Sequence, residues 1–235
     1  MRTPLHVIPA LLSLAAIGCG TTAKWTYPPN EATRYTATES HPQRVAVKMG
    51  SDQRSSENSN MFAMYLIPIN PWGWMEYQRP EAARMYNTVV EYDMDMSKDP
   101  ALAVAEEFKR SKLFPQAYFT YGGDTDGAWV CEVTPVKFAY NGRVYSYGLS
   151  VFGPLLWFLG LPAGRSECDL EFHLSLKNAS GKEVWFGSLS GSDVVRNGLY
   201  YNWGRDVSGF VTVFEREMQQ VLPQIEAAVD STPGA

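Results

Sequence analysis

The serines, histidines and carboxylates of this 235-residue sequence are the side chains that could carry out catalysis. Residues 187–191, Gly-Ser-Leu-Ser-Gly, come close to the Gly-x-Ser-x-Gly turn that presents a nucleophilic serine, but Leu189 stands where that serine belongs. Beyond the N-terminal segment the only histidines are His41 and His173, and His173 alternates with apolar neighbours as a solvent-facing strand residue does. A hydrolase is therefore an alternative that lacks a placed nucleophile and general base, and we expect that the protein is not an enzyme.

Metal chemistry has one candidate segment, Gly-Gly-Asp-Thr-Asp-Gly at residues 122–127. Asp124 and Asp126 lie beside glycines, as in calcium-binding loops, but the first and twelfth positions of such a loop would be Gly122 and Val133, which supply no carboxylate. No cluster of His, Cys and acidic residues has the spacing of a zinc or iron site. We expect a polar turn here, and no metal or cofactor.

Two cysteines, Cys131 and Cys168, could form a disulfide if the chain is exported. The expected strand register argues against this bond. If the strands on either side of Trp157 pair about that residue, Cys131 lies opposite Glu183 and far from Cys168. Two buried thiols are the alternative.

These side chains would need rigid elements to position them, and the sequence predicts an α+β fold. We expect a mixed or antiparallel hairpin sheet, packed by one internal helix and one C-terminal amphipathic helix. Alternation of apolar and polar residues predicts strands at 44–49 and 167–178, and Asn141-Gly142 is typical of a hairpin turn.

The two helices have recognisable signals of their own. Asp99 followed by Pro100 is typical of a helix start and predicts the internal helix over the next residues. Residues 207–229 repeat apolar side chains with helical spacing and predict the C-terminal helix. A single domain is therefore expected over residues 44–229, followed by a disordered tail at 230–235.

The first 18 residues are typical of an export signal. Arg2 precedes an apolar run that is shorter than the about 20 residues needed to cross a bilayer. The run ends in Ala16-Ile17-Gly18-Cys19, which resembles the lipobox of bacterial lipoproteins, where the cysteine sulfur receives diacylglycerol. An ordinary secretory signal with an incidental cysteine is the alternative. Gly20 replaces the aspartate that retains many such proteins at the inner membrane, so the resemblance implies an outer-membrane anchor facing the periplasm.

Residues 19–43 comprise the lipidated Cys19 and a polar stretch rich in Thr and Pro, which we expect to be a tether. Fully extended, this stretch would span about 80 Å. Loss of Arg2 with the signal leaves 19 basic against 25 acidic residues, a formal charge of −6 instead of −5. An acidic chain without a basic run predicts no nucleic-acid partner, and the lipid would be its attachment to the membrane.

Two uncharged stretches, residues 61–75 and 144–164, are rich in aromatic and aliphatic side chains. They could fold back as core, insert into a membrane, or form a lip that accepts a lipid tail or an envelope protein. Insertion would be redundant for attachment, although it could orient the domain. The side chains expected to line such a lip are Trp72, Trp74, Phe152, Leu156, Trp157 and Phe158.

Short motifs add a family resemblance. Val45-Ala46-Val47, Asp52-Gln53-Arg54 and Ser111-Lys112-Leu113-Phe114 are similar to segments in auxiliary lipoproteins of ABC-type exporters and in N-terminal domains of curli-secretion and Tol-system proteins. The resemblance implies a lipid-anchored, non-catalytic accessory protein that binds an envelope complex or a lipid. A purely structural lipoprotein, with both uncharged stretches in its core, is the alternative.

Overall fold

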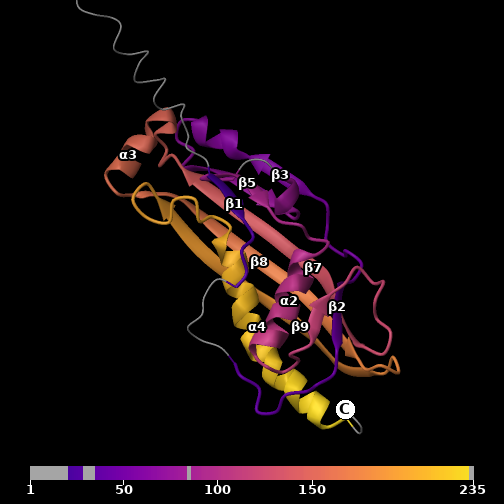
Figure 1. Ribbon diagram of the computed structural model, residues 1–235. Coiled ribbons are helices and arrows are strands. Elements are labelled where there is room, and N and C mark those ends of the chain that lie inside the picture. The colour runs from indigo at the N-terminus through magenta and orange to yellow at the C-terminus, as the bar shows by residue number, and fades with distance from the viewer. Residues whose placement is uncertain (1–20, 29–34, 84–85, 233–235) are drawn as a thin grey trace, which may run out of the picture.

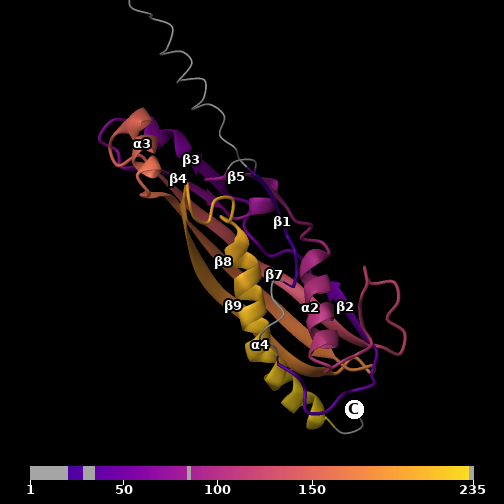
Figure 2. The same cartoon turned by 60° about the vertical axis from the view of Figure 1, so that its left-hand side comes forward.

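The computed structural model describes residues 21–28, 35–83 and 86–232, and it confirms the α+β class. A mixed seven-stranded sheet forms one layer of an elongated molecule (Figure 1). The second layer covers one face of this sheet and consists of two helices and a short two-stranded sheet (Figure 2). The described part of the chain leaves much of the opposite face of the sheet open.

Three long antiparallel strands dominate the sheet: β7 (Trp129–Tyr145), β8 (Pro162–Lys177) and β9 (Glu183–Gly198). The second edge of β7 is divided between two strands. Its first half pairs in parallel with β2 (Val45–Met49), which in turn pairs with β6 (Ala117–Phe119). Its second half pairs antiparallel with β4 (Trp72–Tyr77), which pairs with β3 (Asn58–Met61).

The covering layer contains the two predicted helices, α2 (Asp99–Arg110) and α4 (Ser208–Asp230). Beside them, β1 (Thr21–Lys24) pairs in parallel with β5 (Val89–Asp93), and a short 3-10 turn, η2 (Pro80–Ala82), precedes β5. The alternating residues of β8 and the apolar stripe of α4 meet in the core and are at most 5% exposed. They are Cys168, Leu170, Phe172, Leu174, Leu176, Phe210, Val213, Phe214, Met218, Val221 and Ile225.

The hairpin turn expected at Asn141-Gly142 was wrong, because β7 continues through both residues. Gly142 has another use in this strand. A Cβ atom there would lie 2.7 Å from the phenol of Tyr140, so the missing side chain leaves room for that ring. The buried Tyr140 hydroxyl then lies 3.1 Å from Ser166 Oγ on β8.

The prediction of a free tether was also wrong for residues 21–28 and 35–43, because these residues pack on the domain. Trp25 is buried and meets Phe214 of α4 edge to face at 5.8 Å. Thr38 N–H donates to Glu226 Oε1 at 2.6 Å, and His41 N–H donates to the Leu113 carbonyl at 3.0 Å. Large aromatic side chains and backbone pairing hold this Thr- and Pro-rich segment in place.

The C-terminal boundary differs slightly from the expected one. α4 includes Asp230, and Ser231 and Thr232 still donate backbone hydrogen bonds to Ala227 and Val229. The prediction that a disordered tail begins at residue 230 was therefore wrong for residues 230–232, which are ordered. The export signal expected at residues 1–18, the lipidation expected at Cys19 and the last three residues of the expected tail lie outside the described residues.

Candidate functional site

The two uncharged stretches meet at one end of the sheet and form a single structure. They contain η1 (Phe62–Leu66) in the first stretch, and η3 (Ser150–Phe152) and α3 (Pro154–Phe158) in the second. Backbone hydrogen bonds of 2.9–3.0 Å join them, from Ile69 N–H to the Gly148 carbonyl and from the Ser146 and Tyr147 N–H groups to the Pro71 carbonyl. The Ser146 hydroxyl adds a bond of 2.6 Å to the Asn70 carbonyl.

We call the exposed apolar residues of this end the apolar tip. They come from both stretches: Leu66, Ile67, Ile69, Leu149, Val151, Phe152, Leu155, Phe158, Leu159 and Leu161. Six of them are 60–88% exposed. Isolated exposed apolar residues are common on soluble proteins, but a contiguous group without charge is typical of an interaction site.

The tip rests on well-defined contacts. Trp157 is half-buried against the core, and its indole N–H donates to the Tyr145 carbonyl at 3.0 Å. The hydroxyl of Tyr200, in the turn after β9, donates to the Phe158 carbonyl at 3.0 Å. A Cβ atom at Gly153 would lie 2.6 Å from the Ser146 backbone, so glycine allows the chain to fold closely over the end of β7. The exposed side chains therefore project from a fixed backbone.

The six residues expected to line a lip fall into two groups. Phe152, Leu156, Trp157 and Phe158 lie in the tip, where Leu156 and Trp157 are half-buried. Trp72 and Trp74 instead alternate with the buried residues of β4 and point to the open face of the sheet. The pocket that Trp74 lines contains none of the four tip residues. The alternative that both stretches are core was wrong for the exposed residues of the tip.

The N-terminal strand begins close to this same end. The Thr21 N–H donates to the Thr88 carbonyl at 3.0 Å, and the Thr21 side chain lies against Gly204. Gly204 belongs to the turn between β9 and α4 whose Tyr200 bonds to α3. Figures 1 and 2 show α4 running from this region to the opposite end of the molecule.

A buried carboxylate fastens that turn. Asp206 accepts hydrogen bonds from the Thr88 N–H at 2.9 Å and the Ser166 hydroxyl at 2.8 Å, and closer ones from the Thr88 hydroxyl and the Asn197 amide. Burial raises the pKa of Asp206, and the hydrogen bonds oppose this rise only in part. Because Thr88 also holds Thr21, the network links the start of β1 to the sheet.

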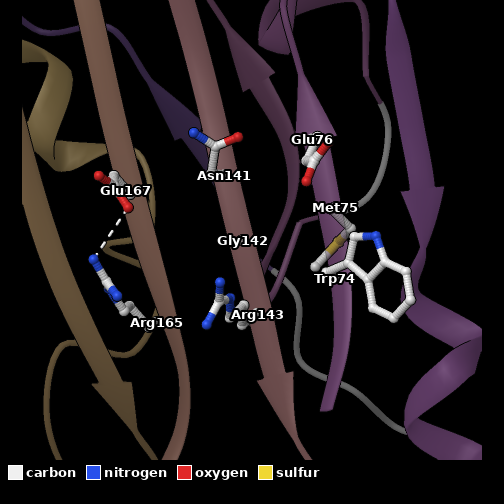
Figure 3. A pocket seen from close by; sticks show the side chains of 8 residues that line it. All are labelled: Trp74, Met75, Glu76, Asn141, Gly142, Arg143, Arg165 and Glu167. Carbon is white, nitrogen blue, oxygen red and sulfur yellow. Dashed lines mark hydrogen bonds and ion pairs between the residues drawn. The ribbon is translucent and has the colours of Figure 1, made fainter.

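The open face carries a pocket of about 290 Å³ near the tip. Its lining combines aromatic, basic and acidic residues (Figure 3): Trp74, Met75, Glu76, Asn141, Gly142, Arg143, Arg165 and Glu167. Arg165 Nη2 lies 3.1 Å from Glu167 Oε2, and the Arg143 guanidinium carbon lies 5.4 Å from the centre of the Trp72 ring. No periodic pattern in the sequence relates the two arginines, because they come together only through strand pairing.

The catalytic candidates are not assembled as a hydrolase would need. Residues 187–191 lie within β9, and Ser188 is the register partner of His173 on β8. His173 Nε2 lies 3.2 Å from Glu171 Oε1, and no hydrogen bond joins His173 to Ser188 in the described parts of the chain. Asp124 of the predicted polar turn pairs with Arg44 at 3.4 Å. Within residues 21–28, 35–83 and 86–232, no group of three or more His, Cys, Asp or Glu side chains is placed to hold a metal ion.

The two cysteines are free, buried thiols, so the disulfide was wrong. Cys131 pairs in register with Leu176, and Cys168 pairs with Tyr140. They are therefore eight positions apart along the sheet, about 26 Å, where a disulfide needs Cα atoms within about 7 Å. The register expected from Trp157 was also wrong, because Cys131 does not face Glu183. Burial raises the pKa of Cys131 to about 12.

Comparison of the chain with protein-family models, curated proteins and solved structures finds no match. The resemblance to envelope accessory lipoproteins therefore stays a prediction. Its motifs have structural roles here: Val45–Val47 lies in β2, Arg54 is buried between Asp52 and Glu81, and Leu113 and Phe114 are fully buried. None of the described helices is both long enough and apolar enough to cross a membrane.

Proposed function

We propose that this chain is a lipid-anchored, non-catalytic accessory protein of the bacterial cell envelope, attached through Cys19 to the outer membrane and facing the periplasm. The apolar tip contacts the membrane that holds the lipid, and this contact orients the open sheet for a partner in the envelope. The observation that carries the proposal is the position of the tip, which lies at the end of the molecule where β1 begins.

Chain length supports this arrangement. Cys19 precedes Thr21 by two residues, which span at most about 7 Å. Because Thr21 is fixed beside Thr88 and the turn at Gly204, acyl chains on Cys19 hold this end of the fold at the lipid surface. The exposed side chains of the tip then face the bilayer without any rearrangement of the domain.

The energetics favour orientation over anchoring. Six tip side chains are at least 60% exposed, and burying each contributes about 1–2 kcal/mol, or roughly 6–12 kcal/mol for all six before ordering costs. This is enough to hold one orientation of a protein that is already attached. The acyl chains supply the attachment itself.

A fluorescent label placed at two matched positions tests the proposal. The variants Phe152→Cys in the tip and Phe186→Cys on β9 each introduce a thiol at a side chain that is 65% or 58% exposed. Cys131 and Cys168 are buried, so an environment-sensitive maleimide selects the introduced thiol. In the lipidated protein, reconstituted into vesicles, we expect a blue-shifted emission for the label at position 152 only.

Phe186 serves as the control because it pairs with Ser175, near the opposite end of the sheet. Aqueous emission from both labels, with the protein attached to the vesicles, would contradict membrane contact by the tip. Protection of position 152 only when another envelope protein is added would assign the tip to a protein partner instead.

A further inference from the structure

We propose that three arginines beneath the tip bind the phosphate of an anionic phospholipid headgroup. Arg143, Arg165 and Arg196 are register partners on β7, β8 and β9, and we call them the arginine row. This inference rests on the proposed function, because it requires the apolar tip to be in contact with the bilayer.

The arginine row is a like-charge arrangement that the described ion pairs neutralise only at Arg165. Neighbouring strands lie about 4.8 Å apart, and like charges directly opposite one another destabilise a sheet. Among the residues that the structure describes, Glu167 is the one carboxylate that forms an ion pair with the row, through Arg165. Arg143 lies over the Trp72 ring, and the described residues give Arg196 no ion pair. Three cations therefore face the open side of the sheet with one paired anion, which favours an anionic ligand.

The order of side chains along the open face matches the layers of a membrane surface. Of the three rows nearest the tip, the most distant consists of Glu76, Asn141 and Glu167 on β4, β7 and β8. The arginine row comes next, as Figure 3 shows for its two members in the pocket. Trp72 and Tyr145 form the following row, and the apolar tip lies beyond. Successive rows are about 7 Å apart, since they differ by two residues.

This order places each side-chain type where a bilayer accepts it. Apolar side chains enter the acyl boundary, aromatic side chains prefer the interface, and phosphates lie just outside. The planar guanidinium group binds phosphate oxygens through paired N–H donors. Glu76 and Glu167 line the pocket of about 290 Å³ on the side away from the tip, and Trp74, Arg143 and Arg165 line it on the side nearer the tip, where an anionic headgroup would enter.

Vesicle flotation with charge-matched variants tests the arginine row. The protein is the mature chain from residue 19 with Cys19→Ser, which contains every described residue and lacks the lipid. The test variant carries Arg143→Gln, Arg165→Gln and Arg196→Gln. The control carries Lys137→Gln, Lys177→Gln and Lys182→Gln, which make the same change of charge farther from the tip. Arg196→Gln alone serves as a second test variant, because this exposed side chain has no ion pair among the described residues.

On vesicles with about 30% phosphatidylglycerol, each arginine is expected to change the lipid concentration for half-maximal binding about fivefold, and the triple variant about a hundredfold. The lysine control is expected to change it less than about threefold. Equal losses for both triple variants would assign the effect to net charge and overturn the arginine row as a site.

The remaining outcomes separate this inference from the proposed function. If the tip variant Phe152→Ser, Leu155→Ser and Phe158→Ser loses binding while the arginine variants bind like the parent chain, the arginine row is refuted and the tip contact stands. If the parent chain fails to bind vesicles, the arginine row and the membrane contact of the tip are both refuted. Glycerol phosphate that binds the arginine row with the affinity measured for vesicles would identify a soluble phosphate ester as the ligand, and would overturn the assignment to the membrane.

Discussion

Removing apolar side chains from the tip is predicted to weaken membrane contact without weakening the fold. We consider the triple variant Phe152→Ser, Leu155→Ser and Phe158→Ser. These side chains are 65%, 60% and 62% exposed, so they contribute little to the core. Surface substitutions of this kind change stability by less than about 0.5 kcal/mol each. The urea midpoint of the mature chain should therefore stay close to that of the parent.

Membrane binding should respond much more strongly. Full burial of a Phe or Leu side chain contributes about 1.5–3 kcal/mol, so the exposed part of each contributes about 1–2 kcal/mol and the three together about 3–6 kcal/mol. Since about 1.4 kcal/mol corresponds to tenfold in an equilibrium constant, the triple variant should bind vesicles roughly 10²–10⁴-fold more weakly.

Flotation of the mature chain carrying Cys19→Ser measures this difference directly, because no acyl chain masks it. Phe186→Ser is the control, since Phe186 is 58% exposed near the far end of the sheet. A loss smaller than tenfold for the triple variant, or an equal loss for the control, would refute the assignment of the tip to the membrane.

Three further predictions concern buried groups. Arg54→Met leaves the carboxylates around it without their cation and should destabilise the protein by about 3 kcal/mol at pH 7 in urea unfolding, and a change below 1 kcal/mol would contradict this. Because burial raises the pKa of Asp206, the parent loses stability as pH rises from the ordinary aspartate pKa, about 3.9, to the raised native value. The stability of Asp206→Asn relative to the parent should therefore increase over that window, and urea titrations that give parallel pH profiles would exclude the effect. Cys131, with its pKa raised to about 12, and Cys168 should resist iodoacetamide at pH 8 until urea unfolds the chain, and labelling of either thiol in the native protein would show that it is accessible.

Elements that bury one face were predictable from the sequence. The alternation in β8 and the stripe of α4 report directly which side chains avoid water, and both elements lie where the pattern placed them. Local turn signals were less reliable. Asn141-Gly142 has the composition of a hairpin turn. In the structure, however, the Tyr140 ring fills the space where a side chain at position 142 would lie, and this packing exists only once the strand has formed.

Long-range contacts account for the other differences. Residues 21–24 are polar and show no strand pattern in the sequence. They form β1 because they pair with the edge of β5 and because the next residue, Trp25, is buried in the core. The absence of charge in residues 61–75 and 144–164 made both stretches unusual. Their packing into one apolar tip depends on hydrogen bonds between residues about 80 positions apart, which the sequence pattern does not reveal. The arginine row likewise arises from register across three strands.

The docking of β1 sets how far the protein can reach. An extended tether would have let the domain sample any height up to about 80 Å above the bilayer. Because β1 is fixed in the fold and Cys19 is only two residues from Thr21, a lipid on that cysteine would hold the domain directly at the bilayer surface. The 16 residues of β8 span about 50 Å, so the hairpin at residues 178–182 would stand at that one distance from the lipid surface. A partner that binds this hairpin in the lipid-anchored protein would have to reach it at a fixed height above the bilayer.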